Sequence, residues 1–175
     1  MADDAENTLI LTLDTGPVTI RLRPDLAPGH VARIKELVRE GFYDGVVFHR
    51  VIPGFMAQGG DPTGTGYSGS SKPNLKAEFS SEPHVRGICS MARSGQPDSA
   101  NSQFFIVFYP RFSLDRKYTV FGRVIAGMDA VDRIERGEPP ANPTRILRAR
   151  MAAGGAVPAP EAAISVDDLN NSKSD

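Results

Sequence analysis

The sequence has no tryptophan, a single cysteine and only three histidines among its 175 residues. One cysteine, Cys89, excludes an internal disulfide and a paired-cysteine metal or redox site. The histidines form no HExxH pattern and no pair at metal-ligand spacing, so we expect no metal and no cofactor. Cys89 stands in the apolar run Ile88-Cys-Ser-Met91. We interpret it as a small buried residue rather than a nucleophile.

Long apolar runs are also absent. None approaches the ~18 residues that a membrane-spanning helix needs. Residues 1–8 lack the basic start and the apolar stretch of a signal peptide. We therefore expect a cytoplasmic protein with no membrane partner. A mass of 18.8 kDa is enough for one domain with a sizeable core.

Charge is divided unevenly along the chain. The formal net charge is -1, and residues 1–8 and 152–175 each carry -3, so residues 9–151 carry +5. Nucleic-acid binding is typical of clustered basic residues with aromatic side chains between them. The 15 arginines of residues 9–151 are instead spread along the sequence. We expect a modestly basic surface and no nucleic-acid partner; retention on heparin at moderate salt would favour the alternative.

Apolar periodicity predicts a mainly β domain with two helices. Val31, Ile34, Leu37 and Val38 form one helical stripe between Pro28 and Glu40, and residues 127–134 predict a shorter helix. Strands are predicted at residues 8–14, 18–22, 46–52, 55–58, 87–92, 104–108, 119–124 and 144–151. Helices that do not alternate with the strands favour a closed or nearly closed antiparallel sheet capped by helices.

The two ends differ from the middle in composition. Residues 1–8 are interpreted as a flexible acidic arm and residues 9–151 as the folded domain. Residues 152–175 are rich in alanine, glycine, proline, serine and acidic residues, and cannot bury enough apolar area to offset the entropy of ordering them. We interpret them as a disordered tail; the alternative is that a segment such as Ala163–Leu169 docks on a partner.

Residues 59–76 form a polar, glycine-rich loop. Gly64-Thr-Gly66-Tyr-Ser-Gly69 matches the GxGxxG pattern, but that pattern indicates nucleotide binding only where it opens a helix. The sequence that follows, Ser70-Ser-Lys-Pro73, is not typical of a helix. We therefore interpret the glycines as positions of positive φ.

Arg50 lies in an apolar hairpin, Phe48-His-Arg-Val-Ile-Pro-Gly-Phe-Met-Ala-Gln-Gly-Gly-Asp61. An arginine is rarely buried without a partner. It is either a rim residue paired with a carboxylate, or a fixed guanidinium beside an apolar hollow made by Phe55 and Met56, with Gln58 as a neutral hydrogen-bonding group. Spacing alone leaves both interpretations open.

The same 14 residues resemble the signature of the cyclophilins, the cyclosporin-type peptidyl-prolyl cis-trans isomerases. The resemblance extends over about residues 9–151. It includes Tyr43-Asp-Gly45, Ser90-Met-Ala92, Asn101-Ser-Gln-Phe-Phe-Ile106 and Tyr118-Thr-Val-Phe-Gly122. It implies a closed eight-stranded antiparallel β-barrel capped by two α-helices. It also implies an isomerase that acts on proline-containing peptides and unfolded protein clients, and we expect a monomer.

The resemblance assigns the site residues. Arg50, Phe55 and Gln58 match the catalytic positions. The matching substrate-binding positions are Met56, Gly64, Thr65, Ala92, Arg93, Gln103, Phe105, Leu114 and Tyr118.

Three positions depart from the family pattern. Ser113 replaces the usual tryptophan, Tyr118 a usual histidine and Arg93 a common asparagine. The missing tryptophan predicts weak cyclosporin binding and resembles bacterial-type cyclophilins. Arg93 can still supply backbone contacts, but its side chain is expected to alter which residues are preferred before proline.

Two functions remain open on this scaffold. One is catalysis of X–Pro isomerisation, in which Arg50 stabilises a twisted amide while the apolar residues hold the proline ring. The other is a proline-peptide binding module or chaperone with incidental turnover. Binding alone would not require an arginine at position 50, so the sequence favours the enzyme.

Overall fold

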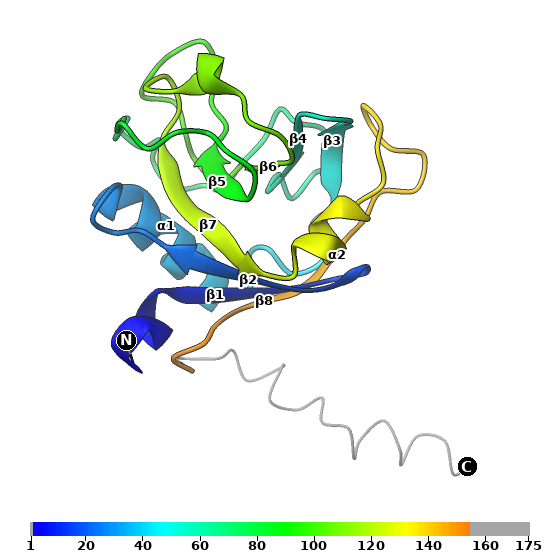
Figure 1. Ribbon diagram of the computed structural model, residues 1–175, viewed down its shortest axis with the longest axis horizontal. Coiled ribbons are helices and arrows are strands. Elements are labelled where there is room, and N and C mark those ends of the chain that lie inside the picture. Colours follow the sequence, from blue (N-terminus) through cyan, green and yellow to red (C-terminus); the bar gives the residue numbers. More distant parts are fainter. Residues whose placement is uncertain (1, 155–175) are drawn as a thin grey trace.

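The computed structural model describes residues 2–154. It contains eight strands and two α-helices (Figure 1). The strands are β1 (Thr8–Leu13), β2 (Gly16–Leu22), β3 (Phe48–Ile52), β4 (Met56–Gly59), β5 (Ile88–Met91), β6 (Phe104–Val107), β7 (Val120–Ala126) and β8 (Ile146–Met151). The helices are α1 (Pro28–Arg39) and α2 (Met128–Asp132), and Ala2–Asn7 and Phe112–Leu114 form 3-10 helices. Every predicted strand and both predicted helices are present.

The strands form one sheet in the order β3-β4-β6-β5-β7-β2-β1-β8, and each neighbouring pair is antiparallel. Within the described residues the edge strands β3 and β8 share no ladder, although an isolated bridge joins Val47 to Arg145 near their ends. The prediction of a closed barrel is therefore wrong: the sheet is a curled, open half-barrel. Along the edge of β3, the N–H and carbonyl of Val51 pair with Gly137 of the α2–β8 connection. The N–H of Phe48 donates to the carbonyl of Thr144, just before β8 begins, at 2.9 Å.

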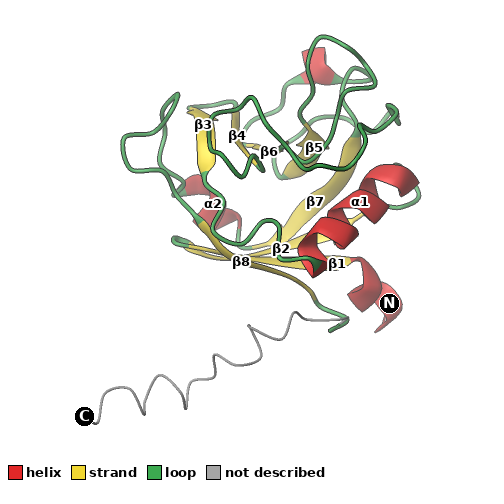
Figure 2. Cartoon of the chain, turned by 180° about the vertical axis from the view of Figure 1, so that it is seen from behind, coloured by secondary structure: helices red, strands yellow, loops and turns green. Residues whose placement is uncertain are grey.

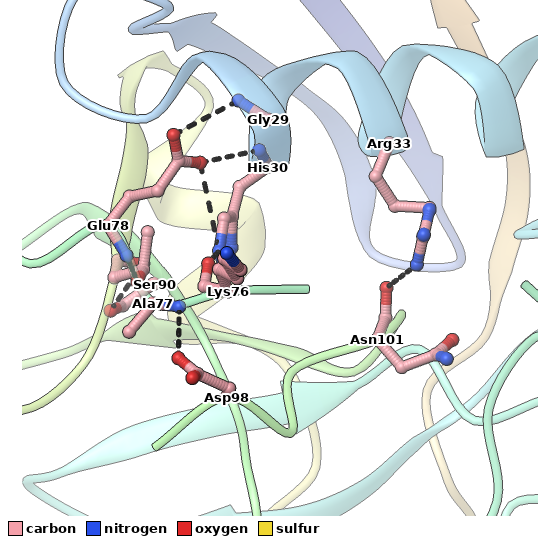
Figure 3. A network of polar contacts seen from close by, with 10 residues as sticks. Gly29, His30, Arg33, Lys76, Ala77, Glu78, Ser90, Asp98 and Asn101 are labelled. Carbon is pink, nitrogen blue, oxygen red and sulfur yellow. Dashed lines mark hydrogen bonds and ion pairs between the residues drawn. The ribbon is translucent and has the colours of Figure 1, made fainter. Parts of the chain in front are cut away.

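Helix α1 begins with an unusual cap. Pro28 occupies its first turn, and Ala27 before it has no side chain that could cap the helix. The carboxylate of Glu78 takes that role and accepts hydrogen bonds from the N–H groups of Gly29 at 3.2 Å and His30 at 2.8 Å (Figure 3). Helices α1 and α2 lie on opposite sides of the molecule (Figure 2), and buried residues of both belong to the same main core.

Alternation along β4, β5 and β6 separates two apolar clusters. Ala57, Cys89 and Ile106 belong to the main core between the sheet and α1. Met56 and Phe105, their chain neighbours, belong to a second cluster on the other face of the same strands. Because successive side chains of a strand point to opposite faces, a fully buried strand needs a cover on each side. The residues that anchor β4, β5 and β6 in the main core therefore fix the orientation of their neighbours in the second cluster.

The two ends of the described part of the chain lie together along the β1–β8 edge. The N–H of Ala152 donates to the carbonyl of Thr8 at 2.8 Å, and that of Ala153 donates to Ala5 at 3.1 Å. Flexibility of residues 1–8 stays a prediction, and the structure describes most of this segment as the 3-10 helix Ala2–Asn7. Most of the predicted tail, residues 155–175, lies outside the described residues. None of the helices that the structure describes is long and apolar enough to cross a membrane.

Candidate active site

A row of paired residues crosses four strands and carries the candidate site. Arg50 of β3 pairs with Gln58 of β4, Gln58 with Phe105 of β6, and Phe105 with Ser90 of β5. Residues directly opposite one another in a sheet project to the same face. Register alone therefore brings together Arg50 and Phe105, which are far apart in the sequence.

A small hollow of about 120 Å³ opens on this face. It is lined by Arg50, Phe55, Met56, Gln58, Ala92, Arg93, Phe105, Leu114 and Tyr118. Nine of the twelve residues assigned from the sequence thus lie around one cavity. Apart from its arginines, the lining holds no charged side chain and no imidazole. It can therefore bind an apolar ring and donate hydrogen bonds to polar groups attached to that ring.

The ring of Phe105 is held on two sides. It stacks on His84, with centroids 6.1 Å apart and planes at 19°, and meets Tyr118 edge-on at 5.7 Å. His84 lies 2.9 Å from both Asp115 Oδ1 and Ser90 Oγ. This arrangement contains the three side chains of a hydrolase triad, but Ser90 and His84 are fully buried. Ser90 is therefore no nucleophile, and the chain supports Phe105.

Arg50 satisfies both interpretations left open by its spacing. Its Nε donates to Glu138 Oε1 at 3.0 Å, and its Nη1 lies 3.5 Å from Gln58 Oε1 beside the hollow. Its side chain is 47% exposed. It is therefore a rim arginine paired with a carboxylate and also a guanidinium held against an apolar cavity. Glu138 is a site residue that no sequence motif reveals, because it stands 88 positions from Arg50 in the α2–β8 connection.

A chain of amides connects Arg50 to a second, larger hollow. Gln58 Nε2 donates to Gln103 Oε1 at 2.9 Å, and Gln103 Nε2 donates to the carbonyls of Gly66 and Ser68, both at 2.9 Å. The second hollow has a volume of about 570 Å³ and shares Gln58, Ala92 and Arg93 with the first. Gln103 therefore lies where the resemblance placed it, beside the neighbouring pocket.

Gly64 and Thr65, two assigned substrate-binding residues, line neither hollow. Gly64 has φ 70° and packs against Val47. The hydroxyl of Thr65 donates to Asp61 at 3.1 Å. Their place on the wall of the larger hollow is taken by the residues that follow, Gly66 to Ser70. The positive φ expected in this loop is present at Gly64 and Gly66.

Two arginine–aromatic contacts frame the smaller hollow. The guanidinium of Arg93 lies 4.8 Å from the ring centre of Tyr118, and its Nε donates to the Lys117 carbonyl at 2.9 Å. Arg111 lies 3.9 Å from the ring centre of Phe55. Such cation–π contacts fix an aromatic wall without closing the cavity. Arg111 cannot be identified from the sequence, because nothing in its local pattern distinguishes it from other surface arginines.

The histidines stay outside the chemistry of the hollow. His49, next to Arg50, is only 7% exposed and packs beneath Gly66 of the loop. Burial lowers the pKa of His49 despite the opposing charge of Asp61, so the imidazole is neutral at neutral pH. Cys89 is fully buried, as predicted, and burial raises the pKa of its thiol.

Comparison with known proteins agrees with this geometry. The family model for cyclophilin type peptidyl-prolyl cis-trans isomerases matches residues 8–151. A probable peptidyl-prolyl cis-trans isomerase of Brucella suis is 54% identical over 168 aligned residues, covering 87% of this chain and 86% of its own. Peptidyl-prolyl cis-trans isomerase B of Bacillus subtilis is 44% identical over 127, covering 71% and 87%.

Solved structures show the same fold. Cyclophilin AquaCyp293 from Hirschia baltica superposes with a TM-score of 0.80 and 32% identity, covering 86% of this chain and 76% of its own. A Cryptosporidium parvum cyclophilin crystallised in the presence of the dipeptide Ala-Pro gives a TM-score of 0.77 and 27% identity, covering 82% and 98%. The matched family model and these relatives show that the chain belongs to the cyclophilin-type peptidyl-prolyl cis-trans isomerases.

Proposed function

We propose that Arg50 accelerates rotation about X–Pro bonds by stabilising a twisted amide without any covalent step. The observation that carries this proposal is the position of the guanidinium at the edge of the apolar hollow, with Gln58 beside it. The Ala-Pro dipeptide used with the Cryptosporidium relative supports a proline-containing substrate here. The clients are exposed X–Pro segments of folding chains, met in the cytoplasm by a monomeric enzyme.

The chemistry explains why so few groups suffice. Resonance gives the peptide C–N bond partial double-bond character and a barrier of ~18–20 kcal/mol. At an X–Pro bond the isomers differ by only ~0.5–1 kcal/mol but exchange over tens to hundreds of seconds. A catalyst need only favour the twisted state, in which the prolyl nitrogen regains its lone pair. Neither a nucleophile nor a proton transfer is required.

Each part of the hollow has a task in this mechanism. Phe55, Met56, Phe105 and Leu114 hold the proline ring and exclude water. Arg50 donates hydrogen bonds toward the substrate and toward the developing lone pair. Its planar, permanently charged fork is already oriented when the bond twists, so little reorganisation is needed.

Substitution of Arg50 tests the proposal. We expect Arg50→Ala to lower kcat/KM by ~10²–10³, the cost of removing one preorganised transition-state donor. Arg50→Lys should be nearly as poor, because an ammonium lacks the planar fork. Peptide affinity should fall much less. The unfolding midpoint should hardly change, because the pair with Glu138 is exposed. Exchange NMR on an Ala-Pro peptide and a melting curve measure these quantities.

Two outcomes would contradict the proposal. If Arg50→Ala keeps kcat/KM within threefold, Arg50 is not the catalytic group. If the wild-type protein binds the peptide but substoichiometric amounts do not broaden the cis and trans signals, the protein is a binding module or chaperone.

A further inference from the structure

Glu138 uses one edge of the Arg50 guanidinium and leaves the other free. The Nε–H is donated to Glu138 at 3.0 Å, and Nη1 has only the 3.5 Å contact with Gln58. No described residue accepts a hydrogen bond from Nη2. The two terminal nitrogens, on the side of Gln58, thus keep hydrogens available to a ligand in the hollow. The carboxylate binds the edge that the mechanism does not need.

The backbone fixes where Glu138 lies. Val51 and Gly137 exchange two hydrogen bonds, of 2.8 and 2.9 Å. Arg50 precedes Val51 and Glu138 follows Gly137, so this bridge brings the two side chains into reach. Gly137 has φ 145°, and an added Cβ would lie 2.6 Å from the Cα of Pro140. The bend that carries Glu138 back to β3 therefore requires glycine.

Stability does not account for such a construction. The side chains of Arg50 and Glu138 are 47% and 56% exposed, and an ion pair this exposed adds little to the free energy of unfolding. The chain contains a matched pair away from both hollows, Arg86 with Asp132, at 2.6 Å with exposures of 47% and 40%. The two pairs differ in that Arg50 lines the smaller hollow and Arg86 lines neither hollow.

We infer that Glu138 is a positioning residue: its carboxylate holds the Arg50 guanidinium in one orientation, with both Nη groups available to the twisted amide. The inference rests on the proposed role of Arg50. A free arginine side chain samples many rotamers and must lose that freedom in the transition state. Glu138 imposes the order before the substrate arrives, so its contribution appears in kcat. The negative charge of Glu138 also partly neutralises the positive charge of the guanidinium. Arg50 therefore acts on the substrate mainly through oriented hydrogen bonds.

The test compares Glu138→Ala and Glu138→Gln with the wild type, with Asp132→Asn as the matched control. We expect Glu138→Ala to lower kcat roughly two- to fivefold, the range given by an exposed ion pair, with peptide Kd nearly unchanged. Glu138→Gln keeps an acceptor oxygen at the same length and should recover part of the loss. In 1 M salt the wild type should approach Glu138→Ala, because salt screens the pair. Asp132→Asn removes the same charge and should leave kcat unchanged.

A spectroscopic signal separates positioning from general effects on the fold. The Arg50 Nε–H resonance, assigned by its loss in Arg50→Lys, should exchange faster with water in Glu138→Ala, while the Arg86 Nε–H resonance stays unchanged. An unchanged kcat in Glu138→Ala, a gain in kcat, or an equal loss in Asp132→Asn would overturn the inference. Arg50→Ala is measured in parallel. Activity retained there overturns the proposed function, whereas an inactive Arg50→Ala with an unaffected Glu138→Ala overturns only the role of Glu138.

Discussion

Phe105 shows how a residue of the hollow depends on groups that never meet the substrate. Its ring lies between His84 and Tyr118, and His84 is fixed by Asp115 and Ser90. Burial lowers the pKa of His84 although the nearby Asp115 opposes the shift, so the imidazole is neutral at neutral pH. The support beneath Phe105 is therefore a neutral imidazole held in place by hydrogen bonds with Asp115 and Ser90.

Ser113 sets the expected response to cyclosporin. It is exposed in the 3-10 helix Phe112–Leu114, next to Leu114 of the hollow, and lines neither cavity. Serine supplies neither the large flat ring nor the indole N–H of a tryptophan. We expect weak inhibition of the wild type and at least tenfold tighter inhibition of Ser113→Trp, with kcat/KM for a peptide nearly unchanged. Titration of the isomerase activity measures both; tight inhibition of the wild type with no gain from tryptophan would contradict the assignment of this position.

The pH dependence of activity follows from the groups around Arg50. A guanidinium is charged throughout the neutral range, Gln58 does not ionise, and the lowered pKa of His49 keeps that imidazole neutral. We expect kcat/KM to vary by less than about twofold between pH 6 and 9, measured by exchange NMR. A bell-shaped profile centred near pH 7 would indicate an acid–base residue and contradict the twisted-amide mechanism.

At the scale of elements, one carboxylate organises the loop between β4 and β5. Asp61 is fully buried and accepts hydrogen bonds from the backbone N–H groups of Thr63, Gly66 and Ser68 and from the hydroxyls of Thr63 and Thr65. Burial alone would raise its pKa, but these hydrogen bonds together lower it to about 2. The same loop presents the two carbonyls that hold Gln103.

Replacement of Asp61 by Asn tests this organisation. The amide nitrogen cannot accept hydrogen bonds, so one set of loop donors loses its charged acceptor. We expect the free energy of unfolding to fall by about 1.5–3 kcal/mol. For peptides that reach the larger hollow, KM should rise more than kcat falls. Urea titration and peptide kinetics measure the two effects. Asp98→Asn is the control, since exposed Asp98 caps one backbone N–H. A loss of stability equal to that control would contradict the role of Asp61.

The elements themselves could be predicted because their signals are local. The stripe of Val31, Ile34 and Leu37 predicts α1, and alternation predicts the strands within a few residues. The pairing of Val51 with Gly137 at the edge of β3 could not be predicted, because the two residues share no motif. The cap of α1 by Glu78 is likewise a contact between distant residues. The local sequence pattern determines which elements form. It does not determine which backbone groups form hydrogen bonds with residues far away in the sequence.

At the scale of the molecule, the three histidines act on stability in the same direction. His30, His49 and His84 are buried, and that burial lowers the pKa of each from 6.5. Below pH 6.5 the unfolded chain therefore binds protons that the folded chain does not, so the free energy of unfolding decreases with falling pH. Above pH 6.5 the contribution is fully present. Each histidine adds at most about 1.4 kcal/mol per pH unit.

We accordingly expect the urea midpoint to fall between pH 7 and pH 5, while activity stays level over its neutral range. His49→Gln, which removes one titrating group near the glycine loop, should reduce the slope by about a third. Asp61 acts in a separate window, because its pKa of about 2 contributes stability that is lost only below pH 4. A midpoint that stays constant between pH 7 and pH 5 would show that the buried imidazoles take up protons without loss of structure.

The site residues, like the elements of the fold, could be predicted where the signal is local in the sequence. The residues of the smaller hollow were assigned because they lie inside long matching segments, and the structure gathers nine of them around one cavity. Glu138 and Arg111 were not assigned, because each acts through a single contact. Glu138 contacts Arg50, and Arg111 contacts the ring of Phe55. Such contacts depend on the three-dimensional path of loops that carry no motif.

The first and last parts of the folded domain meet along the β1–β8 edge, and this has a practical consequence. Ala5 and Ala153 share a backbone hydrogen bond there. The hollow is lined by residues of β3, β4 and β6, and β3 and β4 lie away from β1 and the N-terminal helix (Figure 1). A carrier protein or a solid support joined next to either of these residues leaves the cavity facing away from the attachment. A short linker could also join residues 5 and 153, so the folded domain could be circularised or given new termini in a surface turn without crossing the site.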